Sequence, residues 1–171
     1  MLTTSRLELV WASPIHAPLL LELNKDPEVI RYTGDHSLLN LAQAQTQIKE
    51  RFEPQKINYK MGRFLVFRKD GTFLGWCGLR FSPEKNEVDL GYRLMKKHWG
   101  QGYATEASQA CLEYGFKTLG LKRVVAQASP ENIPSIKVIQ KLGFSFRGVV
   151  PENGVSWVFY EISDKQFVYK E

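Results

Sequence analysis

The chain has 171 residues, of which 43% are hydrophobic and 24% are charged, and it carries a net charge of +5. This length and composition are those of one folded domain, taken as residues 1–171, and they exclude a disordered or repetitive protein. The positive charge suits an anionic ligand, but the Lys and Arg residues form no dense block of the kind typical of nucleic-acid binding. No apolar run approaches the roughly 20 residues of a membrane span. We therefore expect a cytoplasmic protein with no nucleic-acid or membrane partner.

The first half of the chain predicts one strand, two helices and an antiparallel meander. Residues 4–10 alternate apolar and polar side chains, as a strand does, and Ser13-Pro14 is a helix start signal for a short helix that ends near residues 24–27. Apolar residues at helical spacing predict a second helix over residues 39–52. Three strands follow, with Asp70-Gly71 as the hairpin turn between the first two; they cover residues 63–68, 72–80 and 87–94.

The second half alternates helices and strands. A long helix over residues 102–119 ends at Gly120, and a shorter one over residues 132–142 ends at Gly143. Strands are predicted at 123–129, 144–150 and 155–162, the last two joined by a turn at residues 151–154. This order implies a parallel pairing inside a mixed sheet. The fold class is therefore α+β, with a central, mostly antiparallel twisted sheet of about seven strands flanked by about four helices.

The segment that carries the chemistry is a glycine-rich turn between a strand and the long helix. It reads Trp99-Gly100-Gln101-Gly102-Tyr103-Ala104-Thr105. A turn of this kind directs unpaired backbone N–H groups toward one point, and the helix dipole adds positive potential there. Glycines let the backbone approach phosphate oxygens closely. The turn therefore predicts a phosphate site.

Other interpretations of the turn are a simple tight connection into a helix and a dinucleotide site of the Rossmann type. A short glycine motif alone does not separate them. Against the Rossmann interpretation, Thr105 occupies the position of the third glycine, and an antiparallel meander precedes the turn. A Walker phosphate loop is excluded because no GK[ST] follows. Cys77 and Cys111 lack the spacing of zinc ligands, so we expect no metal.

Residues 91–107, GYRLMKKHWGQGYATEA, resemble motif A of the GNAT superfamily of N-acetyltransferases, and in particular its Rim-type branch of ribosomal-protein N-terminal acetyltransferases. Three further stretches resemble this branch in order and spacing: TSRLEL at 4–9, NKDPEVIRYTG at 24–34 and ENIPSIKVIQKLGFSFRG at 131–148. The resemblance implies a GNAT fold and acetyl transfer from acetyl-CoA to a primary amine. The acceptor would be a protein N-terminus or a small-molecule amine, and family habit allows a homodimer.

The resemblance also assigns cofactor contacts. The family's pyrophosphate turn falls on Trp99 to Ala104 and continues to Thr105, with Trp99 where many members have Arg or Gln. The strand end at Leu94, Met95 and Lys96 resembles the segment whose backbone pairs with the pantetheine arm and supplies an oxyanion contact. Asn132 matches an asparagine that binds pantetheine, although it is also suited to capping the following helix.

Two catalytic assignments follow from the resemblance. In many members a tyrosine at the position of Ile139 acts as the acid that protonates the leaving thiolate. This chain lacks that tyrosine, so Ser135 is the expected proton donor. The alternative role for Ser135 is to help cap its helix. Asp89, with Glu87 on the same strand face, matches an acidic position and is the expected general base. An alternative to catalysis is an acyl-CoA-binding sensor domain without turnover.

Overall fold

The computed structural model describes residues 1–152 and 154–169, so Asn153 in the predicted last turn lies outside the described residues. The described chain contains an eight-stranded sheet in the order β1-β2-β3-β4-β5-β6-β8-β7. The strands are β1 (Leu2–Thr3), β2 (Leu7–Trp11), β3 (Arg63–Arg68), β4 (Phe73–Ser82), β5 (Glu87–Leu94), β6 (Arg123–Ala128), β7 (Ser145–Glu152) and β8 (Val155–Ser163). Neighbouring strands pair antiparallel except β5 and β6, which are parallel. The predicted mixed sheet is confirmed.

The eighth strand comes from the N-terminus. The predicted strand over residues 4–10 begins only at Leu7, as β2, and β1 at residues 2–3, which was not predicted, pairs with it around a bend at Ser5-Arg6. The hydroxyl of Thr4 accepts the backbone N–H of Leu7 at 2.9 Å inside this bend. Leu7 and Leu9 then point into the core, as their alternation predicts.

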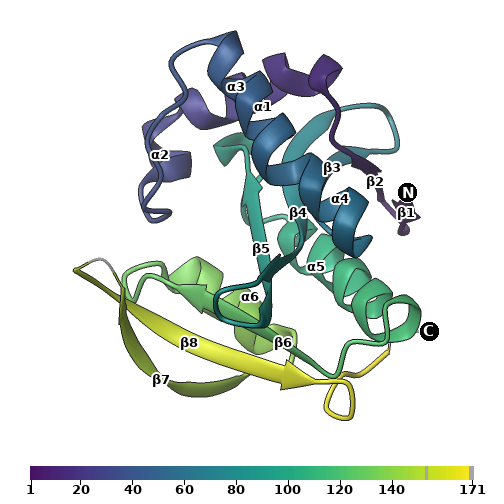
Figure 1. Ribbon diagram of the computed structural model, residues 1–171, viewed down its shortest axis with the longest axis vertical. Coiled ribbons are helices and arrows are strands. Elements are labelled where there is room, and N and C mark those ends of the chain that lie inside the picture. Colours follow the sequence, from purple (N-terminus) through teal and green to yellow (C-terminus); the bar gives the residue numbers. More distant parts are fainter. Residues whose placement is uncertain (153, 170–171) are drawn as a thin grey trace.

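Helices cover both faces of the sheet (Figure 1). The first face carries α1 (Ala17–Lys25), α2 (Pro27–Ile30), α3 (Leu41–Gln47) and α4 (Glu53–Tyr59), and the second carries α5 (Tyr103–Glu113) and α6 (Ile133–Lys141). Shorter segments are the 3₁₀ turns η1 (Pro14–His16) and η3 (Lys96–His98) and the π-helical turns η2 (Ile48–Phe52) and η4 (Tyr114–Thr118). Because η2 joins α3 directly to α4, the predicted second helix extends beyond residue 52. None of the described helices combines the length and apolarity needed to cross a membrane.

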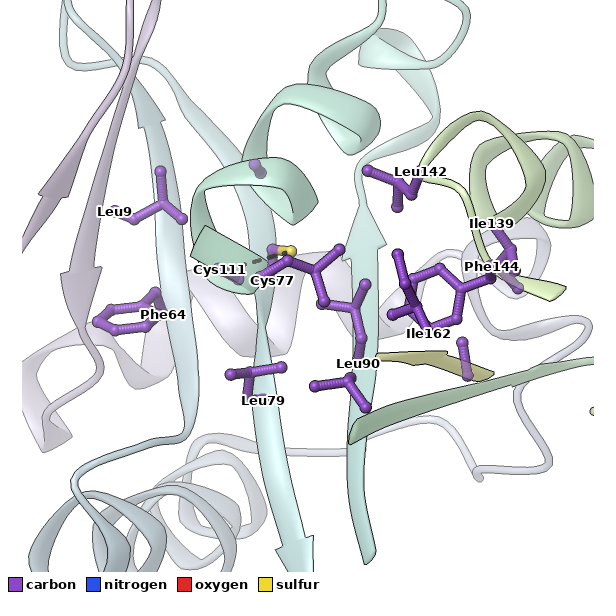
Figure 2. Packing of buried hydrophobic residues seen from close by; sticks show 14 of the residues in the cluster. Leu9, Phe64, Cys77, Leu79, Leu90, Cys111, Ile139, Leu142, Phe144 and Ile162 are labelled. Carbon is purple, nitrogen blue, oxygen red and sulfur yellow. Dashed lines mark hydrogen bonds between the residues drawn. The ribbon is translucent and has the colours of Figure 1, made fainter. Parts of the chain in front are cut away.

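The main core lies between the sheet and α5 (Figure 2). Cys77 of β4 and Cys111 of α5 are both fully buried there, and their sulfur atoms are 3.9 Å apart. Ile139 of α6 is also part of this cluster and is 4% exposed. Ile139, at the position where the family resemblance led us to look for a tyrosine, is therefore a packing residue.

The sheet divides between β5 and β6. Asp89 and Val125 are the one residue pair that joins these strands in the described chain. Beyond that pair, in the described part of the chain, β5 continues to Leu94 and pairs only with β4, and β6 continues to Ala128 and pairs only with β8. The parallel strands therefore diverge toward the ends from which α5 and α6 are reached, and this opening positions the candidate site.

Candidate active site

The glycine-rich turn follows the divergent end of β5 and is separated from it by Met95 and the η3 turn. Gly100 and Gly102 have φ values of +73° and +82°, a left-handed conformation that favours glycine. Gly102 is the residue before α5, and its carbonyl accepts the N–H of Glu106 at 3.1 Å. Within residues 1–152 and 154–169, the backbone N–H groups from Gly100 to Thr105 meet no protein acceptor. A row of unpaired donors at the N-terminus of an 11-residue helix can hold a phosphate or diphosphate.

Trp99 folds back onto the last residue of β5. Its indole N–H donates to the carbonyl of Leu94 at 2.7 Å, while 46% of the residue stays exposed. The carbonyls of Met95 and Lys96 accept the N–H groups of His98 and Trp99 in the η3 turn. The three carbonyls of residues 94–96 are therefore already occupied by the protein itself.

One N–H group of this strand end faces the opening. The N–H of Met95 donates to the carbonyl of Leu74 in the neighbouring β4 at 2.8 Å. Backbone groups alternate in direction along a strand, so the N–H of Leu94 points away from β4 and toward the gap beside β6. Of the residues expected to contact the pantetheine arm, Leu94 therefore offers a free backbone donor and Met95 does not. Lys96 is exposed, and its ammonium lies 3.7 Å from Glu28.

Ser135 lies across the same opening, on α6. The side chain of Asn132 accepts the N–H of Ser135 at 3.2 Å, so Asn132 does cap this helix. The phenol of Tyr92 on β5 donates to the hydroxyl of Ser135 at 3.2 Å. Burial raises the pKa of Tyr92 despite this hydrogen bond, so the phenol keeps its proton at neutral pH. The structure therefore brings Ser135 together with a tyrosine from the strand.

Asp89 is held in ion pairs on the opposite face of β5. Its carboxylate accepts hydrogen bonds from Arg63 and, at 2.8 Å, from Arg80. Burial alone would raise the pKa of Asp89, but the two guanidinium groups outweigh it and lower that pKa. A carboxylate with a lowered pKa and both oxygens engaged is a weak proton acceptor. This geometry does not support the expected base role, and Glu87 is likewise paired, with Arg123 at 3.0 Å.

A cavity of about 370 Å³ opens on the face that carries α1 and α2. Its floor is apolar, and two carboxylates and two ammonium groups surround it; it is lined by Glu22, Leu23, Asp26, Val29, Met95, Lys96 and Lys97. The loop after α2 also reaches β8, since a Cβ on Gly34 would lie 3.8 Å from the ring of Trp157. This face is accessible next to Met95, which directly follows Leu94.

The sequence did not predict two side chains that contact residues of the site, Tyr92 and Arg6. Tyr92 belongs to the GYRL stretch, but only the docking of α6 shows that it meets Ser135. Arg6 belongs to the N-terminal TSRLEL stretch, and its guanidinium donates to the carbonyl of Gln101 in the glycine-rich turn at 3.1 Å. The motif stretches contain both residues, but they did not show which partners the two side chains contact.

The acetyltransferase (GNAT) domain family matches residues 6–145. The uncharacterized N-acetyltransferase p20 of Bacillus licheniformis is 32% identical over 151 residues, which cover 87% of this chain and 84% of that protein. A putative GNAT-family acetyltransferase from Bordetella pertussis superimposes with a TM-score of 0.81 at 25% identity, over 94% of this chain and 97% of the other. RimL, a ribosomal alpha-N-protein acetyltransferase solved with coenzyme A, shares the fold with a TM-score of 0.80 at 19% identity, over 94% of this chain and 95% of the other.

Proposed function

The chain belongs to the GNAT family of acetyltransferases, and on that premise we propose that it binds acetyl-CoA at the β5–α5 turn and transfers the acetyl group to a primary amine. The observation that carries this proposal is the row of unpaired N–H groups from Gly100 to Thr105. Those donors match the needs of a diphosphate, which the helix dipole of α5 further stabilises. Residues 1–171 act as one domain in this proposal.

The opening between β5 and β6 would receive the pantetheine arm. The backbone N–H of Leu94 faces that opening and would donate to the thioester oxygen, where negative charge develops during attack. The carbonyls of residues 94–96 accept hydrogen bonds within the protein, and the N–H of Met95 donates to Leu74, so the pantetheine arm would pair with this strand end mainly through the N–H of Leu94. Asn132 lies at the far side of the opening and would contact the arm in addition to capping α6.

Ser135 would donate the proton that the leaving thiolate needs. A hydroxyl carries one donor and accepts through its lone pairs. Because the phenol of Tyr92 already donates to Ser135, the proton of Ser135 is free to point elsewhere, toward the sulfur. In this proposal Tyr92 orients Ser135, and Ser135 supplies the proton that the resemblance assigns to a tyrosine at the position of Ile139. Asp89 is left out of the chemistry because its ion pairs lower its proton affinity. The proton that the attacking amine loses would pass to water, and water would return a proton to Ser135 after Ser135 has protonated the thiolate.

The amine acceptor would approach from the face of α1 and α2. The cavity there lies beside Met95; the carboxylates of Glu22 and Asp26 on its lining would attract an ammonium group, and Lys96 and Lys97 on the same lining would attract an anionic part of the acceptor. A protein N-terminus and a small-molecule amine both fit this chemistry. Among relatives, a ribosomal-protein-serine acetyltransferase of Escherichia coli is 27% identical over 89 residues, and this supports peptides as the first acceptors to test.

The test combines binding with turnover. We expect calorimetry to show binding of coenzyme A, and a thiol-release assay with acetyl-CoA to show turnover with at least one member of a panel of peptides with different N-terminal residues, polyamines and amino sugars. Binding without thiol release on any amine would instead favour a sensor domain. Tight binding of NAD(P) with no binding of coenzyme A would refute the proposal.

A further inference from the structure

Arg6 lies against the outer side of the glycine-rich turn, although 95 residues separate it from Gln101 along the chain. Its Nη1 donates to the carbonyl of Gln101 at 3.1 Å, and its guanidinium stacks over the ring of Tyr103 with 4.5 Å to the ring centroid. A Cβ on Gly102 would lie 3.4 Å from its Nη2. The side chain therefore contacts Gln101 and Tyr103 and lies beside Gly102 between them.

The contact with Gln101 determines where the next amide points. A trans peptide is planar, and its N–H points opposite to its C=O. Because the carbonyl of Gln101 points toward Arg6, the N–H of Gly102 points away from Arg6, and among the described residues it meets no protein acceptor. Gly102 has a φ of +82°, and a glycine at this position can turn its peptide at little cost if nothing holds it. The hydrogen bond from Arg6 opposes that rotation.

Arg6 also neutralises a carboxylate in the first turn of α5. Glu106 accepts the Nε of Arg6 at 2.6 Å, the backbone N–H of Arg6 at 3.1 Å and the hydroxyl of Ser5 at 3.2 Å. Burial raises the pKa of Glu106, but hydrogen bonds from Thr4 and Arg6 more than compensate and lower it, so the group is ionised at neutral pH. An unpaired negative charge at this place would repel a diphosphate bound at the same helix end.

From these contacts we infer that Arg6 is a positioning residue for diphosphate binding: it aims the N–H of Gly102 at the ligand and cancels the charge of Glu106. The inference rests on the proposed binding of acetyl-CoA at this turn. It adds that the phosphate-binding turn is completed by the bend between β1 and β2, far away in sequence. The ligand class is a diphosphate ester, and pantetheine alone should not depend on Arg6.

The experiment compares Arg6→Met with Arg147→Met. Arg147 is a matched control because its Nε pairs with Glu161 at 2.7 Å and its side chain is 48% exposed, against 2.6 Å and 46% for Arg6 with Glu106. We expect Arg6→Met to raise the Kd of coenzyme A and the KM of acetyl-CoA about tenfold or more, as loss of a charged hydrogen bond does, with kcat at saturation changed less than about twofold. Arg147→Met should leave all three unchanged.

Two further measurements separate positioning from a general structural role. With S-acetylpantetheine, which lacks the diphosphate, Arg6→Met should match the unaltered protein in kcat/KM. Arg6→Met/Glu106→Gln should bind coenzyme A more tightly than Arg6→Met alone, because the unpaired charge is gone. Unchanged coenzyme A affinity in Arg6→Met, or an equal loss with S-acetylpantetheine, would overturn the inference. No coenzyme A binding by the unaltered protein would instead refute the proposed function itself.

Discussion

Gly102→Val tests whether the turn before α5 holds the cofactor. Gly102 has a φ of +82°, which an L-amino acid adopts at a cost of about 1–2 kcal/mol, and more for a β-branched one. Its new Cβ would also press on Arg6 at 3.4 Å. The backbone relieves both problems by rotating, and this rotation turns the N–H groups of Gly102 and Tyr103 away from the site.

The magnitude follows from those two donors. A hydrogen bond to a charged group contributes about 1.5–3 kcal/mol, so losing two costs about 3–6 kcal/mol, or at least about a 100-fold increase in the Kd of coenzyme A. Strain alone should lower Tm by only a few degrees in a chain of this size. Gly120→Val is the matched control, because Gly120 has a φ of +67° with no heavy atom within 4 Å of its Cβ position, and it lies beyond the opposite end of the helix.

Calorimetric titration with coenzyme A and thermal unfolding of both variants decide the outcome. Both should unfold at slightly lower temperature, and only Gly102→Val should lose affinity. If the two variants bind coenzyme A within about threefold of each other, the unpaired amides do not hold the diphosphate and the reasoning fails.

Three other substitutions give independent checks. Ser135→Ala should lower kcat about tenfold or more while the Kd of acetyl-CoA changes less than twofold, because the proton donor is lost and the binding surface is not; equal turnover would remove Ser135 from the mechanism. Asp89→Asn should reduce the free energy of unfolding by about 1–3 kcal/mol at pH 7. Because the folded-state pKa of Asp89 is lowered below 3.8, the stabilisation by its ion pairs is present above pH 3.8 and is lost as the pH falls further. Urea unfolding at pH 3 should therefore show a smaller difference in free energy between Asp89→Asn and the unaltered protein than at pH 7. An equal difference at both pH values would count against the ion pairs. Trp99→Phe should abolish the fluorescence change that coenzyme A produces, since Trp99 is 46% exposed beside the site; a persisting change would place the ligand elsewhere.

Local sequence patterns determined most of the elements. The left-handed glycines at 100 and 102 and the start of α5 at Tyr103 follow from the glycine-rich turn itself, because backbone geometry there depends on neighbouring residues. The meander β3–β5 was likewise predictable from strands rich in apolar residues and from the turn at Asp70-Gly71, where Gly71 donates to the carbonyl of Arg68 at 2.9 Å. The family resemblance implied that Asn132 and Ser135 belong to the site.

The pairings that define the site were decided by tertiary structure alone. Tyr92 meets Ser135 across 43 positions and Arg6 meets Glu106 across 100, because α6 and α5 dock on a sheet whose strand register sets which side chains face them. Asp89 fitted the pattern of a base until Arg63 and Arg80, from two other strands, were found on its carboxylate. A sequence specifies which residues share a strand face through its period of two, but the partner across the gap depends on register and docking, which are cooperative properties of the whole fold.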